Sequence, residues 1–204
     1  MKPWDQLADD AMIAKTVEAL GQNGIQASVV ATGSHAKEAV VSLIPEGAEV
    51  MTMSSVTLET TGIAKELNTS GRYHPVRDKL YAMNRETQHV AMLKLGAAPE
   101  WAVGSVHAAT QDGHLLIASN TGSQLPAYAS GSAHVIWVVG VQKIVVNTEE
   151  GIKRIYENTL PLESDRARKA YGVAGSAVNK LLIINKEVVP GRLMVIFVKE
   201  KLGF

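Results

Sequence analysis

His114 to Val146 reads HLLIASNTGSQLPAYASGSAHVIWVVGVQKIVV, two apolar runs joined by a loop of small and hydroxylated residues. The runs Leu115–Ala118 and Val135–Val139 are rich in aliphatic residues and show no polar alternation, which is typical of strands covered on both faces. The loop between them, Ser119–Ser132, is longer than most connections in compact domains. Loops of that kind usually serve a ligand or a partner, so this region is the first candidate for a functional site.

The rest of the chain alternates predicted strands with predicted helices, as α/β proteins do. The sheet is therefore expected to be mainly parallel, to carry helices on both faces, and to contain Val29-Val30, Val50–Met53, Leu115–Ala118 and Val135–Val139. Further strands are predicted at Trp101–Val106, Leu181–Ile184 and Leu193–Val198. Helices are predicted at Asp9–Asn23, His35–Ile44, Glu86–Leu95, Asp165–Tyr171 and from a Thr148 cap to a stop before Pro161. Residues 72–77 support no prediction beyond a break at Pro75.

Composition excludes several classes of function. The 204 residues contain no cysteine, which rules out thiolate catalysis and cysteine-ligated iron or zinc, and we expect no bound redox cofactor. Twenty basic residues balance twenty acidic ones without a basic stripe, so a nucleic-acid partner is not expected. No apolar run approaches the roughly 20 residues of a membrane span, and the first residues do not resemble a signal peptide. We expect one soluble, cytoplasmic domain over residues 1–204.

The first candidate ligand groups follow the strand that is predicted to end at Met53. In open α/β sheets, ligands bind beyond the carboxyl ends of the strands. Ser54, Ser55 and Thr57 lie where that strand passes into a helix, so their hydroxyls and free backbone N–H groups are suited to a phosphate or a carboxylate. Glu59 in the first helical turn is a candidate general base. The alternative interpretation, favoured by the residues alone, is that the hydroxyls are N-caps worth about 1 kcal/mol each and that Glu59 complements the helix dipole.

A second group of candidates lies in the loops around the apolar runs. Their polar or conformationally free residues could hold an anion, although no P-loop or G-x-G-x-x-G motif is present; they are Asn120, Thr121, Gly122, Ser123, Gln124 and Lys143. His107 is a candidate acid–base group. With Asp112 and His114 it also suggests a metal site, but Asp112-Gly113 is a hairpin signal that explains these residues better, so no metal is predicted. We expect an anionic small molecule to bind where the Ser54–Glu59 segment meets these loops.

Several motifs together resemble the LUD (lactate utilisation) domain family. The first half of the chain carries IPEGAEV at Ile44–Val50, SSVTLE at Ser54–Glu59 and Gly62-Ile63. The second half carries, in the order of that family, Ala108, Thr110, Asp112-Gly113, Gly122, Gly131, Val135–Gly140, Lys143–Val145 and Glu200–Phe204. The resemblance implies a three-layer α/β/α sandwich of the NagB/RpiA/CoA-transferase-like type. It also implies a link to L-lactate oxidation to pyruvate, in which partner subunits hold the iron–sulfur clusters and a subunit like this chain holds none.

The chain departs from the family pattern at three positions of the candidate site. His107 stands where many relatives carry Asn, Ser119 where some carry Asp, and Gln124 where many carry Arg. The missing arginine would have been a bidentate ligand for a carboxylate, so an acid-binding role cannot be transferred to Gln124.

Three functions remain open. The first is an accessory or ligand-binding component of lactate or organic-acid utilisation that works with redox partner subunits. The second is a standalone enzyme of the superfamily acting on a phosphorylated or carboxylated small molecule. The third is a purely structural subunit, which would bind no small molecule.

Overall fold

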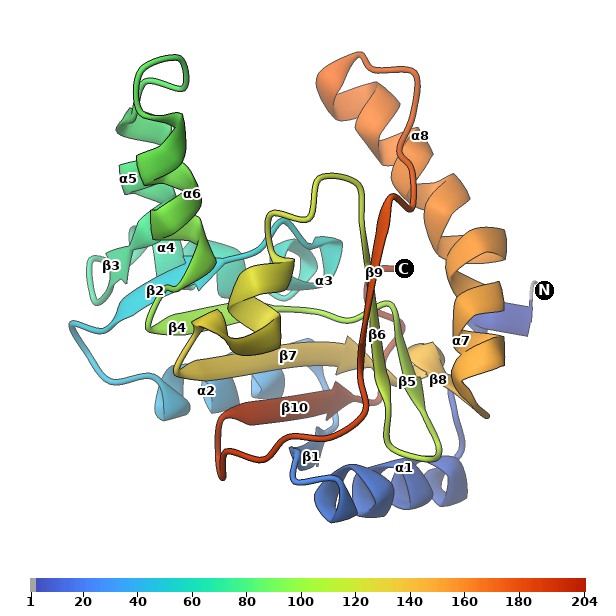
Figure 1. Cartoon of the computed structure of the whole chain (residues 1–204). Coiled ribbons are helices and arrows are strands. Elements are labelled where there is room, and N and C mark those ends of the chain that lie inside the picture. The colour runs from blue at the N-terminus through green and yellow to red at the C-terminus, as the bar shows by residue number, and fades with distance from the viewer. Residues whose placement is uncertain (1–2) are drawn as a thin grey trace.

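The computed structural model describes residues 3–204, and its centre is a six-stranded sheet in the order β1-β10-β7-β4-β2-β3 (Figure 1). All five pairings in this sheet are parallel, which confirms the predicted α/β class. The strands are β1 (Gln26–Val30), β2 (Glu49–Thr52), β3 (His74–Pro75), β4 (Trp101–Gly104), β7 (His134–Gly140) and β10 (Leu193–Val198). The two central strands β7 and β10 are buried almost throughout, as their unbroken apolar sequences predict.

The run Leu115–Ala118 was wrongly assigned to the parallel sheet. It forms β6 (Leu115–Ser119) in a second sheet of four strands, in the order β8-β5-β6-β9. The other strands of this sheet are β5 (Ala108–Thr110), β8 (Ile144–Val145) and β9 (Lys180–Ile184). β6 pairs antiparallel with both β5 and β9. The hairpin predicted at Asp112-Gly113 is present, with Gly113 at a φ of 85°.

The second sheet explains why β6 looks like a central parallel strand. Leu115 and Ile117 pack into the core between the two sheets, whereas Leu116 packs on the opposite side with Ile155 of the long C-terminal helix. Both faces of β6 are therefore apolar, and the period of two that marks a half-exposed strand disappears. Sequence periodicity cannot distinguish such a strand from one in a parallel sheet.

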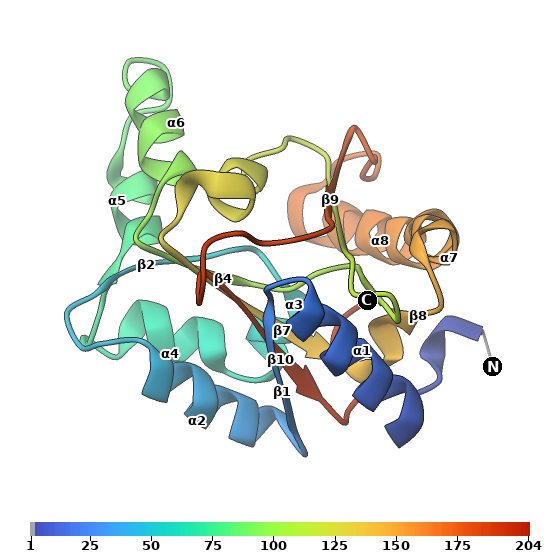
Figure 2. The same ribbon diagram turned by 60° about the horizontal axis from the view of Figure 1, so that its bottom comes forward.

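Helices cover both sides of the main sheet, which agrees with a three-layer α/β/α fold (Figure 2). One face packs on α2 (Gly33–Leu43), α3 (Val56–Thr60) and α4 (Ile63–Thr69). The other face packs on α1 (Asp10–Gln22) and on the second sheet. α1 begins after its Asp9 cap, close to the predicted start, and buries Ile13, Thr16 and Leu20 at helical spacing; this is not the face expected from the sequence, because Ala11 and Ala14 are exposed.

The two predicted C-terminal helices are one continuous helix. It consists of α7 (Thr148–Arg154), a π-helical turn η4 (Ile155–Thr159) and α8 (Leu160–Tyr171). The stop predicted at Pro161 is wrong because the wider turn before it shifts the hydrogen-bond register, with Leu160 N–H donating to Ile155 O. The N-cap is Asn147, one residue before the predicted cap, and its side chain accepts a hydrogen bond from Glu150 N–H.

The remaining elements lie around these layers. α5 (Val76–Ala82) and α6 (His89–Ala97) form an arm that stands away from the sheet at the upper left of Figure 1. Three short turns complete the fold: η1 (Pro3–Asp5), η2 (Ala127–Gly131) and η3 (Val141–Lys143). Among residues 3–204, no helix has the length and apolar character needed to cross a membrane.

Candidate functional site

Three polar side chains meet beyond the carboxyl ends of β2, β4 and β7. Lys143 lies in η3 directly after β7, Thr57 lies in α3 after β2, and Ser105 follows β4. Lys143 Nζ donates hydrogen bonds to Thr57 Oγ1 at 3.3 Å, Ser105 Oγ at 3.1 Å and the carbonyl oxygen of Val106 at 3.2 Å. The sheet therefore joins residues that lie far apart in the sequence at the edge where α/β proteins bind ligands.

The two hydroxyl groups are oriented as acceptors for the Lys143 ammonium. Ser105 Oγ donates its own proton to Val138 O at 2.7 Å, and Thr57 Oγ1 donates to Leu202 O at 3.2 Å. Their lone pairs are therefore free to face Nζ. The ammonium group is solvated by neutral oxygens, and within residues 3–204 no carboxylate forms an ion pair with it.

Burial makes the charged form of Lys143 energetically unfavourable. The residue is only 2% exposed, and burial together with the nearby charge of Arg154 lowers the pKa of Lys143 to about 7. An ammonium that must be desolvated without an anionic partner loses its proton far more readily than a surface lysine. Near neutral pH, Lys143 therefore changes readily between its charged and its neutral form.

His107 lies next to this cluster and is neutral at physiological pH. Its Nδ1 accepts a hydrogen bond from Ala118 N–H at 3.0 Å, so the ring proton is on Nε2. Burial, and then the charges of Lys143 and Arg154, lower the pKa of His107 to about 3. Such a ring is suited to donating a hydrogen bond from Nε2 rather than to transferring a proton near pH 7.

Arg154 is the main site residue that the sequence analysis missed. It ends α7 with a side chain that is 0% exposed, and its Nη1 donates to His107 O at 2.6 Å and to Thr159 Oγ1 at 3.1 Å. Burial lowers the pKa of Arg154 to about 10, although the charge of Asp5 opposes that effect. One signal was available: Arg154 lies at helical spacing between Gly151 and Asn158, which are both buried.

The predicted helix-start residues do not act together. Thr57 reaches Lys143, but Ser55 caps α3 by accepting a hydrogen bond from Leu58 N–H. Ser54 Oγ accepts a hydrogen bond from Arg77 Nη2 at 3.0 Å, and Glu59 is exposed. Ser54 and Ser55 thus have structural partners of their own, and α3 is a helix of only five residues with a weak dipole.

The predicted loop ligands have hydrogen-bond partners other than Lys143. The loop follows β6 and is tied to β9 and to itself: Asn120 Oδ1 accepts from Asn179 Nδ2 at 2.7 Å, and Gln124 Oε1 accepts from Ser119 Oγ at 2.9 Å. Thr121 Oγ1 donates to Ser123 Oγ, and the backbone of Gly122 packs against the aliphatic part of Lys180. No hydrogen bond within residues 3–204 joins Asn120–Gln124 to Lys143.

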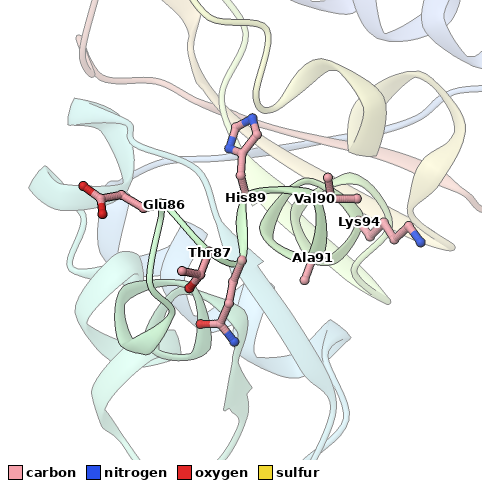
Figure 3. Close-up of a pocket in the computed structure, with 7 residues that line it drawn as sticks. Glu86, Thr87, His89, Val90, Ala91 and Lys94 are labelled. Atoms are coloured by element: carbon pink, nitrogen blue, oxygen red, sulfur yellow. The ribbon is translucent and has the colours of Figure 1, made fainter.

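Two further features of the described chain concern metal ligands and surface hollows. No cluster of three or more histidine, aspartate or glutamate side chains with metal-binding geometry occurs in residues 3–204. An open hollow of about 480 Å³ lies beside the turn that starts α6, where His89, Val90 and Lys94 line it (Figure 3). It contains none of the predicted site residues.

The fold and the site describe an α/β protein with buried cationic groups beyond the carboxyl ends of its parallel strands. The LUD domain model matches residues 13–198, and the chain belongs to the LUD domain family. The resemblance inferred from the sequence motifs is thereby confirmed. Membership supports a role in lactate utilisation at the level of the family.

A solved structure shows the same fold. A crystal structure of a DUF162 family protein from Deinococcus radiodurans matches with a TM-score of 0.59 and 14% sequence identity, over 95% of this chain and 99% of that chain. At this identity the likeness concerns the fold alone. No curated protein matches the chain.

Proposed function

We propose that this chain is an accessory, ligand-binding component of lactate or related organic-acid utilisation that binds a small carboxylate beside Lys143. The observation that carries the proposal is the pair of buried cations, Lys143 and Arg154, whose hydrogen-bond partners are all neutral oxygens. Such a pair costs stability unless an anion compensates it. A carboxylate bound there would also raise the pKa of Lys143 and keep it charged.

The proposal places electron transfer outside this chain. The 204 residues contain no cysteine, so an iron–sulfur cluster of the common type would have to be held by a partner. We propose redox partner subunits for that step and a cytoplasmic setting for the complex. In this scheme, the chain binds the organic acid or its product and the partner carries the electrons.

Binding of L-lactate and pyruvate to the purified protein tests the proposal. Isothermal titration calorimetry at pH 6.5 is expected to show binding that falls on the order of 10–100-fold in Lys143→Met, because the positive charge beside the ligand is lost. Lys153→Met is the matched control, since Lys153 is exposed on α7 and pairs with Glu157. Absence of binding to the wild-type protein, or equal losses in both variants, would count against a carboxylate site at Lys143.

One observation favours the alternative of a standalone enzyme. Ser105 Oγ lies 3.1 Å from Lys143 Nζ, and a lysine with a pKa of about 7 can act as a base toward this hydroxyl when the Ser105 proton turns from Val138 O to Nζ. If the protein alone turns over a carboxylated or phosphorylated substrate, Ser105→Ala is expected to abolish the turnover. Retained activity in that variant would exclude Ser105 as the reacting hydroxyl.

A further inference from the structure

We propose that Arg154 binds the carboxylate group of the ligand through the edge of its guanidinium that is formed by Nε and Nη2. This inference rests on the proposed function and specifies it: the ligand is a small monocarboxylate, and its two oxygens lie against one arginine edge. Gln124, at the position where relatives carry an arginine, would then have no part in binding the acid.

The hydrogen bonds of Arg154 are the first support for this inference. Nη1 is fully used by His107 O and Thr159 Oγ1. Nε and Nη2 are buried, and neither has a hydrogen-bond partner within residues 3–204. Leaving a buried donor unpaired destabilises a protein, and the effect is larger for a charged group. Two adjacent unpaired donors on one planar edge match the two oxygens of a carboxylate.

The helix also holds the Arg154 guanidinium in a fixed orientation. Arg154 and Thr159 are five residues apart, and the π-helical turn η4 places both on the same side so that Nη1 can reach Thr159 Oγ1. The bond to His107 O anchors the same nitrogen to the start of β5. Because Nη1 is held at two points, the Nε–Nη2 edge is presented in one orientation, which reduces the entropy lost on binding. Single π-turns in long helices are frequent at functional sites.

The N-terminal turn η1 lies close enough to Arg154 for its Asp5 charge to act on the guanidinium. Trp4, in η1, packs on the apolar cluster of Ala108, Leu116, Val145 and Ile155, next to Arg154. Asp5, in the same turn, is the acidic residue whose charge acts on Arg154, but its carboxylate is paired with Lys201 Nζ at 2.9 Å. Asp5 therefore offsets the Arg154 charge only from a distance. Because the Asp5 charge already acts on Arg154 in the unliganded protein, Asp5 opposes the binding of a second carboxylate there.

Titrations with three probes separate this inference from the proposed function. Wild-type protein and the variants Arg154→Met, Arg154→Lys and Lys143→Met are titrated with L-lactate, propionate and inorganic phosphate. Wild type is expected to bind both carboxylates, and both Arg154 variants to bind them on the order of 100-fold more weakly. Arg168→Met is the matched control on α8, where Arg168 is exposed and pairs with Asp165, and it is expected to bind like wild type.

The possible results distinguish the role of Arg154 from the proposed function. If wild type binds the carboxylates and the Arg154 variants bind them equally well, the inference is wrong while the proposed function stands. If wild type binds no carboxylate, both are wrong. If phosphate alone binds, the assignment of a monocarboxylate is overturned.

Two further measurements test the role of Arg154 if the Arg154 variants fail to fold. In wild type with ¹⁵N-labelled arginine, the protected Nε–H resonance is expected to shift on addition of propionate, and an unchanged resonance at saturation would overturn the inference. Asp5→Asn is expected to tighten binding roughly two- to tenfold because the competing charge is gone. Asp10→Asn, which removes an exposed carboxylate paired with Lys199, serves as the charge-matched control.

Discussion

Between pH 7 and about 9.5, the free energy of unfolding of the unliganded protein is expected to rise by roughly 2–4 kcal/mol, and Lys143→Met is expected to lose that rise. The folded protein has a Lys143 pKa of about 7, whereas the unfolded chain has the ordinary value of 10.5. In this window the folded state has already released a proton that the unfolded state still binds. Raising the pH therefore favours the folded state.

The window belongs mainly to Lys143 because the other shifted groups titrate largely outside it, and Arg154, with a folded pKa of about 10, adds to the rise only at the upper edge. His107 has a folded pKa of about 3 against 6.5 in the unfolded chain, so its contribution is complete below pH 7. The raised pKa of Tyr73, caused by burial, acts only near and above its ordinary value of 10. Tyr128, whose pKa burial also raises, behaves in the same way. Urea unfolding at several pH values measures the slope.

Lys153→Met should keep the wild-type slope, since Lys153 is exposed. At pH 6.5, Lys143→Met should be more stable than wild type by roughly 1–4 kcal/mol, because an uncompensated buried charge costs more than the acceptors it leaves behind. A flat wild-type profile would mean that Lys143 keeps an ordinary pKa. The buried-cation argument for the site would then fail.

Replacing Glu187 by alanine is expected to lower the free energy of unfolding by about 3 kcal/mol. Glu187 Oε2 lies 2.6 Å from Arg192 Nη1, and both side chains are less than one tenth exposed, at 9% and 7%. Arg192 also donates to the carbonyl oxygens of Ala127, Tyr128 and Ser132. Loss of Glu187 leaves a buried guanidinium without its counter-charge and loosens the η2 segment that Arg192 holds.

The same pair predicts sensitivity to acid. Burial raises the pKa of the Glu187 carboxyl, but hydrogen bonds from Val189 N–H and Arg192 outweigh that effect and lower it overall. Its contribution to stability is present above the ordinary pKa of 4.5 and is lost as the pH falls through the lower folded value. Glu38→Ala, at an exposed position of α2, is the control and should change stability by less than about 0.5 kcal/mol. An equally small change in Glu187→Ala would show that the pair contributes nothing.

Local sequence patterns predicted the strands of the main sheet other than β3, and most of their boundaries. Val135–Val139 is aliphatic or aromatic throughout, and Asp9, the first residue of the predicted helix, caps α1. These features depend on interactions within a few residues. Propensity, capping and periodicity therefore predicted them without knowledge of the rest of the chain.

Contacts between distant segments decided which residues form the candidate site and which sheet β6 joins. The prediction that Thr57 and Lys143 lie at one sheet edge agrees with their hydrogen bond, which spans 86 residues, because parallel strands bring their carboxyl ends together. β6 is as apolar as a parallel strand, and only its pairing with β5 and β9 shows that it belongs to a second sheet. Arg154 looks like an ordinary helix residue until α7 packs on β5 and buries it beside His107, 47 residues away. Burial of a charge and loss of its hydrogen-bond partners are properties of the packed chain, because they depend on which distant atoms exclude water from it.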